Sequence, residues 1–216
     1  MSIYSNSKIR ENEILELEAD FGMTCIEQFC STLRQDARVL EVGSGPAVLL
    51  EKLKEKFPKL ELEGLEPDID NYGAKKGNNF QNNVLIHRLS YEQFTVDKKF
   101  DFIFSINVFE HLNDWKHFID KTATWLQPGG VCVILCPNYG FPYESHYGLP
   151  IVFNKKTTFK IFKTSIQKFD EKNNTYGLWD TLNFVKKKDV LNFLGNHSSF
   201  KYHDMLGIVR VMLARA

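Results

Sequence analysis

The sequence has little of what would direct a 216-residue chain to a membrane, to secretion or to a nucleic acid. No apolar run reaches the ~18 residues that a transmembrane helix needs, so we predict no membrane span. The first residues are polar and acidic where a signal peptide would be apolar, and we therefore expect a cytoplasmic protein. Charge of one sign is also missing, since 27 Lys and Arg balance 27 Asp and Glu. Without a net field that attracts phosphates, we do not expect a nucleic-acid partner.

Cysteine is scarce too, and the four present form neither a CxxC pair nor the tight cluster of a zinc site. Cys132 and Cys136 fall in an apolar, strand-like pattern, which favours small buried side chains over a redox role. We therefore predict no metal site. A chain of this length can bury a core without disulfides and fits one α/β unit.

Apolar runs alternate with amphipathic stretches from residue 37 onward, and this rhythm predicts an α/β fold. The expected strands are 37–42, 60–65, 83–89, 100–105 and 131–136, and the expected helices are 46–57, 68–76 and 114–126. Right-handed crossovers between them give a doubly wound, mostly parallel sheet with helices on both faces. Such a sheet binds its ligand at the carboxyl ends of the strands.

A glycine-rich turn follows the first expected strand, in the string Glu41-Val-Gly43-Ser-Gly45-Pro-Ala47. Gly43 and Gly45 lack the Cβ atoms that would keep a ligand away from the backbone. A dinucleotide fingerprint needs a third glycine at position 48, where this chain has Val48. A pyrophosphate also fits poorly beside the carboxylate of Glu41, whereas a cationic, amino-bearing ligand fits well.

Further polar positions follow the ends of the next strands. Glu66, followed by Pro67, ends the second strand, where a carboxylate can accept both hydroxyls of a ribose. Leu89 and Ser90 end the third strand and would lie beside the base of a bound nucleoside. Asn107 follows the fourth strand and would lie beside the part of the ligand that takes the place of a dinucleotide's phosphates. Together these positions outline an adenosine that carries an amino-acid tail.

The blocks VLEVGSGPA, GLEPD, FDFIFSINVFEHLND and LQPGGVCVILCPN resemble the class I S-adenosylmethionine-dependent methyltransferases between residues 37 and 138. The EHL and PGG blocks resemble the metabolite and ubiquinone-biosynthesis type. The resemblance implies that the cofactor is S-adenosylmethionine, with S-adenosylhomocysteine as product. It also implies that Glu66 holds the ribose, that the turn at Gly43 and Gly45 approaches the methionine part, and that Leu89 and Ser90 form the adenine-side loop.

With this resemblance we divide the chain into four segments. Residues 1–36 form an N-terminal helical cap of two helices broken near Gly22, and residues 37–137 form the cofactor-binding core. Residues 138–184, where the rhythm stops, form an insertion or lid that we expect to bind the acceptor. Residues 185–216 complete the core with a helix at 187–194 and two strands, 200–205 and 208–214. Only two residues join these strands, so we expect an antiparallel C-terminal strand and a seven-stranded sheet.

Two histidines are candidates for the catalytic role because each follows the carboxyl end of an expected strand. His111 lies in the EHL block and His146 in the insertion, where Tyr139, Tyr143 and Glu144 are candidate acceptor contacts. Each has a structural alternative, because His111 can belong to the fold and backbone groups can satisfy a loop histidine. The excess of lysine in the insertion favours either an anionic acceptor or a solvated basic face.

The predicted function is methyl transfer to a small-molecule acceptor, on oxygen in the leading interpretation. An NAD(P)-dependent oxidoreductase with the same strand, turn and helix is one alternative, although the missing third glycine counts against it. A non-catalytic module that binds S-adenosylmethionine is the other.

Overall fold

A computed structural model describes residues 11–68 and 84–196. Its main sheet has the strand order β3-β2-β1-β4-β5, and every pairing in it is parallel. The strands are β1 (Arg38–Val42), β2 (Glu61–Leu65), β3 (Leu85–His87), β4 (Phe100–Ile106) and β5 (Leu126–Leu135). The predicted α/β fold with a parallel sheet is confirmed.

The strand order reverses at β1, which lies between β2 and β4. From β1 the chain runs outward through β2 to β3 and then returns to the other side of β1 for β4 and β5. A reversal of this kind opens a crevice beyond the carboxyl ends of the two central strands, because the crossovers on either side leave in opposite directions. The glycine turn after β1 and the residues after β4 meet at this point.

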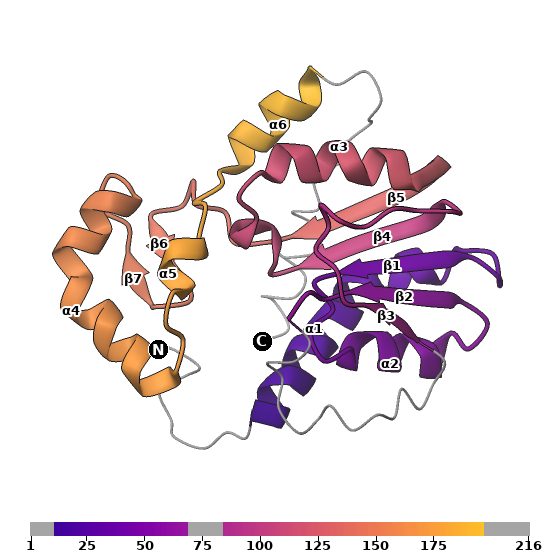
Figure 1. Cartoon of the computed structure of the whole chain (residues 1–216), viewed down its shortest axis with the longest axis horizontal. Helices are drawn as coiled ribbons and strands as arrows, with labels where there is room; N and C mark the ends of the chain where they lie inside the picture. Colours follow the sequence, from indigo (N-terminus) through magenta and orange to yellow (C-terminus); the bar gives the residue numbers. More distant parts are fainter. Residues whose placement is uncertain (1–10, 69–83, 197–216) are drawn as a thin grey trace.

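Helices cover both faces of the sheet, as the sequence predicts (Figure 1). Helices α1 (Glu11–Cys30) and α2 (Val48–Lys56) cover one face, while α3 (Trp115–Trp125) and α6 (Lys187–Gly195) cover the other. Alternation along β4 supplies both cores: Phe102 and Phe104 point to the α1 side, whereas Ile103 points to the α3 side. No described helix is long and apolar enough to span a bilayer.

The predicted break near Gly22 is wrong, because α1 is one continuous helix. A Cβ atom on Gly22 would lie 2.6 Å from Leu49 Cδ2 and 3.1 Å from Ile106 Cδ1. The glycine therefore lets α1 pack closely on α2 and on the end of β4. Glycine costs a helix only about 1 kcal/mol relative to alanine, which this packing can offset.

Three further boundaries differ from the predictions. Helix α2 begins at Val48 and not at Pro46, because Ala47 takes the left-handed conformation with φ 65°. Strand β5 begins at Leu126 and not at residue 131, and it pairs with β4 through a register shift between Phe100 and Phe102. The expected helix 68–76, except Asp68, and the expected strands 200–205 and 208–214 lie outside the described residues, so the seven-stranded sheet stays a prediction.

The segment after β5 forms a separate layer beyond the carboxyl ends of the strands (Figure 1). It consists of an antiparallel pair, β6 (Tyr143–Glu144) with β7 (Leu149–Pro150), followed by α4 (Lys155–Asn173) and α5 (Leu178–Thr181). Its own apolar core is built on Tyr139, Tyr147, Ile166, Trp179 and Leu182. The four-segment division of the chain stays a prediction, but this layer coincides with the expected insertion 138–184.

Candidate active site

The glycine turn after β1 is held by β2. The backbone N–H groups of Gly43 and Ser44 both donate to the carbonyl oxygen of Leu65, at 2.8 and 3.0 Å. Gly43 has φ 77°, and a Cβ atom there would lie 2.2 Å from Val108 Cγ2. Both the backbone conformation and the lack of space therefore require glycine at this position.

Glu66 follows β2 and lies against the same turn. Its side chain is buried, and its two oxygens accept hydrogen bonds from Gly45 N at 2.9 Å and Asp68 N at 3.0 Å. Each carboxylate oxygen has two lone pairs, so both oxygens can accept a further hydrogen bond. The position suits a ligand with two neighbouring hydroxyls, such as a ribose.

Glu41, at the end of β1, is buried with one oxygen, Oε2, that has no hydrogen-bond partner among the described residues. Burial, together with the negative charge of Glu66, raises the pKa of Glu41 to about 8. A buried acceptor without a donor is costly, and an amino-bearing ligand supplies donors. This orphaned oxygen fits the amino-bearing cofactor expected from the sequence, whereas the space beside Gly43 is filled by Val108.

The remaining predicted cofactor contacts follow the neighbouring strands. Asn107 takes the left-handed conformation with φ 56°, and its N–H donates to Leu135 O at 2.9 Å, which ties the end of β4 to the end of β5. Leu89 is partly exposed after β3, and Ser90 N donates to Gln93 Oε1 at 3.3 Å. Pro67 lies on the surface directly after Glu66.

The two predicted histidines come together at a buried carboxylate. Glu110 and His111 lie on the short helix η3 (Phe109–His111) after β4, and His146 lies between β6 and β7. Glu110 is fully buried, and its Oε1 lies 4.0 Å from Nε2 of His111 and 3.8 Å from Nε2 of His146. We call these three residues the Glu110 cluster.

The outward-facing nitrogen of each histidine is held by a side chain of the insertion. His146 Nδ1 lies 2.6 Å from Glu144 Oε1, and His111 Nδ1 lies 2.7 Å from Thr181 Oγ1. Glu144 is itself fixed by backbone N–H groups of His146 and Tyr147, at 3.0 and 2.7 Å. Both imidazole rings are therefore oriented with Nε2 towards Glu110.

Two residues that the sequence analysis missed, Thr181 and Asn183, complete this arrangement. The side-chain amide of Asn183 donates to Phe109 O at 2.8 Å and Leu112 O at 2.9 Å, and its backbone N–H donates to Glu110 O at 2.7 Å. Asn183 thus fastens the end of the insertion to η3. Neither residue carries a motif, and only the fold brings them to the histidines.

Charge and burial separate the pKa values of this cluster. Burial raises the pKa of Glu110 to about 7 and, with the charge of His146, lowers the pKa of His111 to about 4. Burial also disfavours a charged His146, but the hydrogen bond and charge of Glu144 outweigh it, so the pKa of His146 is raised. The same hydrogen bond overcomes the effect of burial on Glu144 and lowers its pKa.

The aromatic residues of the insertion divide into two groups. Tyr139 and Tyr147 are buried in the core of the insertion, and Tyr139 lies with its hydroxyl 3.3 Å from Glu144 Oε1. Tyr143, Phe141 and Phe153 are exposed. Of the two predicted tyrosine contacts, Tyr139 therefore supports Glu144, while the ring of Tyr143 is open to solvent.

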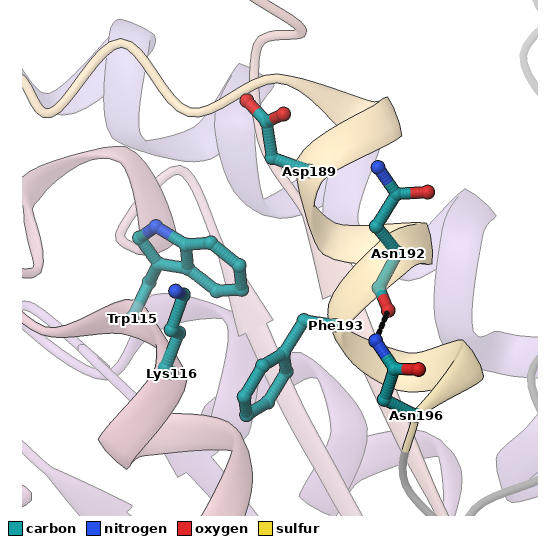
Figure 2. A pocket seen from close by; sticks show the side chains of 6 residues that line it. All are labelled: Trp115, Lys116, Asp189, Asn192, Phe193 and Asn196. Atoms are coloured by element: carbon teal, nitrogen blue, oxygen red, sulfur yellow. Dashed lines mark hydrogen bonds between the residues drawn. The ribbon is translucent and has the colours of Figure 1, made fainter.

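A cavity of about 520 Å³ lies elsewhere, between the start of α3 and helix α6 (Figure 2). Figure 2 shows Trp115 and Phe193 facing each other, with ring centroids 5.5 Å apart, and Asn196 donating to Asn192 O at 2.9 Å. None of the predicted site residues lines this cavity.

A parallel sheet whose strand order reverses at a glycine turn, with an acidic residue at the end of the second strand, is the arrangement expected of the class I methyltransferase fold. The chain belongs to the methyltransferase domain family, which matches residues 21–178. Its class is that of the S-adenosylmethionine-dependent methyltransferases, as the sequence resemblance implies. This membership decides against the NAD(P)-dependent oxidoreductase.

Among its relatives, an uncharacterised protein of Mycobacterium tuberculosis is 29% identical over 207 residues, which are 92% of this chain and 69% of that protein. Malonyl-[acyl-carrier protein] O-methyltransferase 2 of Ilyobacter polytropus is 30% identical over 105 residues. That match covers 47% of this chain and only 39% of the relative.

A solved structure of the plantazolicin methyltransferase BpumL, in complex with a triazolic desmethylPZN analog and S-adenosylhomocysteine, has a similar fold. It superposes with a TM-score of 0.62 over 95% of this chain and 82% of that one, at 12% identity. At this identity the likeness concerns the fold alone.

Proposed function

We propose that this protein transfers the methyl group of S-adenosylmethionine to an oxygen of a small-molecule acceptor held at the Glu110 cluster. The observation that carries the proposal is that two different polar sites lie beyond the carboxyl ends of the strands. One is the glycine turn with Glu41 and Glu66, which suits a cationic adenosine. The other is the Glu110 cluster, which suits a group that loses a proton.

On the cofactor side, Glu66 would hold the ribose hydroxyls, and the turn at Gly43 and Gly45 would approach the amino-acid tail. The orphaned oxygen of Glu41 would accept a hydrogen bond from that part of the ligand. Pro67, Leu89 and Ser90 would border the adenine, and Asn107 would lie beside the tail. The bound cofactor supplies a methyl group that its sulfonium makes electrophilic, so the protein's own task is to position both reactants and to handle a proton.

On the acceptor side, His146 is the group that we propose removes the proton, with His111 beside it. Glu144 holds Nδ1 of His146, which leaves Nε2, the nitrogen on the Glu110 side of the ring, free to take the proton. A base oriented in this way by a carboxylate is a recurring arrangement in enzymes that activate hydroxyl groups. The preference for oxygen also draws on the name of the Ilyobacter relative, an O-methyltransferase. Tyr143 and, through Glu144, Tyr139 would shape the acceptor site within residues 138–184.

The cofactor part is tested by calorimetry with S-adenosylmethionine, S-adenosylhomocysteine and NADH. We expect binding of both sulfur ligands and no binding of NADH. Glu66→Ala should weaken S-adenosylmethionine binding by about 1.5–3 kcal/mol, which is the range for hydrogen bonds to a charged group. Glu55→Ala, an exposed carboxylate on α2, is the matched control and should bind as the parent does. Unchanged affinity in a folded Glu66→Ala variant would refute the ribose role.

The acceptor part is tested by screening a metabolite panel for release of S-adenosylhomocysteine. Acceptors with a hydroxyl group should respond, and matched compounds whose hydroxyl is replaced by hydrogen should not. If amine or carbon acceptors respond and hydroxyl acceptors do not, the oxygen assignment is wrong while the methyltransferase class stands.

A further inference from the structure

Glu110 is a carboxylate that lies fully out of contact with water. Its exposed fraction is 0%, and neither Oε1 nor Oε2 has a hydrogen-bond partner among the described residues. A buried carboxylate without partners costs several kcal/mol unless a proton or a cation neutralises it. Glu110 therefore calls for a neutralising proton or cation, and no hydrogen bond from the described residues stabilises its charge.

The two histidines converge on this carboxylate from separate parts of the chain. Their Nε2 atoms lie 3.8 and 4.0 Å from Glu110 Oε1, too far for hydrogen bonds. One ligand atom from each of the three residues falls within 4.8 Å of the other two. The rings meet at an angle of 71°, with centroids 5.4 Å apart, so they approach one point from different directions.

The other nitrogen of each ring is already bound, as metal-ligating histidines require. His146 Nδ1 contacts the carboxylate of Glu144 and His111 Nδ1 contacts the hydroxyl of Thr181. Such outer contacts fix the tautomer and turn Nε2 towards the ion. Each histidine therefore presents its free Nε2 to a carboxylate that has no hydrogen-bond partner, an arrangement that a purely structural role does not require.

We propose that Glu110, His111 and His146 bind one divalent transition-metal ion of the zinc class. Two imidazole nitrogens and one carboxylate suit Zn²⁺, Co²⁺ or Fe²⁺, whereas Mg²⁺ and Ca²⁺ prefer oxygen ligands. Ligand atoms around tetrahedral zinc are roughly 3.3 Å apart. Binding would therefore shorten the two separations from Glu110 Oε1 by roughly 0.5–0.7 Å and draw the histidine nitrogens together by up to about 1.5 Å.

Three protein ligands leave at least one coordination position for a water molecule or a substrate. This use of the ion rests on the proposed function: the open position would take the acceptor's hydroxyl oxygen, and the ion would lower the pKa of that hydroxyl so that its proton passes to water. His146 would then act on the acceptor through the ion and no longer as a free base. Metal binding itself requires neither cofactor nor acceptor.

The test uses the full chain, freed of metal with a chelator and titrated with Co²⁺ by absorption spectroscopy. We expect visible d–d bands that saturate at one Co²⁺ per chain and disappear when Zn²⁺ is added. Calorimetry should show Zn²⁺ binding at the same ratio, with no response to Mg²⁺ at matched concentration.

Glu110→Gln and His146→Ala should each weaken Zn²⁺ binding more than tenfold, and Glu144→Gln, which loosens His146, should weaken it about 10-fold to 100-fold. His117→Ala removes an exposed histidine of α3 outside the cluster and should bind Zn²⁺ as the parent does. Thermal melting of the metal-free variants checks that each is folded. Glu144→Gln and Glu110→Gln keep the shape of the side chain, so the test survives if His146→Ala does not fold.

The inference fails if no d–d bands form, or if folded Glu110→Gln and Glu144→Gln both bind Zn²⁺ as tightly as the parent. Calorimetry with S-adenosylmethionine on the same samples separates this outcome from failure of the proposed function. Cofactor binding without metal binding overturns only the metal site. Metal binding without cofactor binding overturns only the methyltransferase proposal.

Discussion

The cofactor side and the acceptor side of this site are built in different ways. The cofactor side consists largely of two short strings, residues 41–47 and 66–68, at the ends of the neighbouring strands β1 and β2. The Glu110 cluster comes from two distant segments, η3 and the turn between β6 and β7, and a third segment, α5 with the residue Asn183, holds them in place. Residues that are consecutive in the chain can form a recognisable motif. Residues from distant segments come together only when the insertion packs against the core.

If the two sides are independent, a change in one should leave the other intact. The largest effect is expected on the acceptor side. His146→Ala should lower turnover about 10²–10⁴-fold, the usual contribution of a positioned proton-transfer group. Release of S-adenosylhomocysteine with an acceptor found by the screen measures this effect. The affinity for S-adenosylmethionine, measured by calorimetry, should stay the same, and equal turnover in variant and parent would return His146 to a structural role.

On the cofactor side, substitution of Gly43 should have the largest effect on stability and on cofactor binding. Gly43→Ala meets both a positive φ and the side chain of Val108, and we expect a loss of about 2–4 kcal/mol in unfolding free energy together with weak cofactor binding. Gly177→Ala is the matched control, because Gly177 has φ 88° with nothing within 4 Å. It should cost only the backbone strain of about 1–2 kcal/mol. If urea unfolding gives both variants the same loss, the Val108 contact does not constrain the turn.

The contact between the insertion and the core should be most sensitive to substitution at Asn183. Asn183→Ala leaves the carbonyl oxygens of Phe109 and Leu112 without their donor and should lower the unfolding free energy by about 1–3 kcal/mol. Because η3 carries Glu110 and His111, the turnover of Asn183→Ala should also fall. Its affinity for S-adenosylmethionine should stay the same. Asn192→Ala, on the exposed side of α6, is the comparison variant. A parallel loss of cofactor affinity in Asn183→Ala would show that the two sides are coupled.

Taken per pH unit, the smallest effect comes from the titration of Glu41. Glu41 is protonated more readily in the folded chain than in the unfolded one, because its folded pKa is about 8. Its contribution to stability is therefore greatest below pH ~4.5 and is lost as pH rises towards 8, with a slope of at most about 1.4 kcal/mol per pH unit. Unfolding of cofactor-free Glu41→Gln should depend less on pH over this range than unfolding of the parent. An identical pH profile would mean that Glu41 is ionised in the folded protein throughout.

The accuracy of the sequence predictions follows the same division. The pattern of strands and helices around the parallel sheet was predictable because apolar runs and glycine turns act locally. The predicted helix break at Gly22 was wrong because a glycine inside a helix can mark either a break or a close contact. Only the positions of Leu49 and Ile106 distinguish the two. His111 and His146 were found as single candidates after strands, but their convergence on Glu110 was not.

By itself, the sequence determined the alternation of strands and helices, the glycine turn and the acids at the ends of β1 and β2, because these features depend on neighbours a few residues apart. Only the tertiary structure shows that the residues of the Glu110 cluster come together. His111 and His146 are brought to one buried carboxylate by the pairing of β4 with β5 and by the docking of the insertion through Asn183. Burial then removes the water that would otherwise solvate the charge of Glu110, and this loss of solvent makes the cluster a candidate site for a cation.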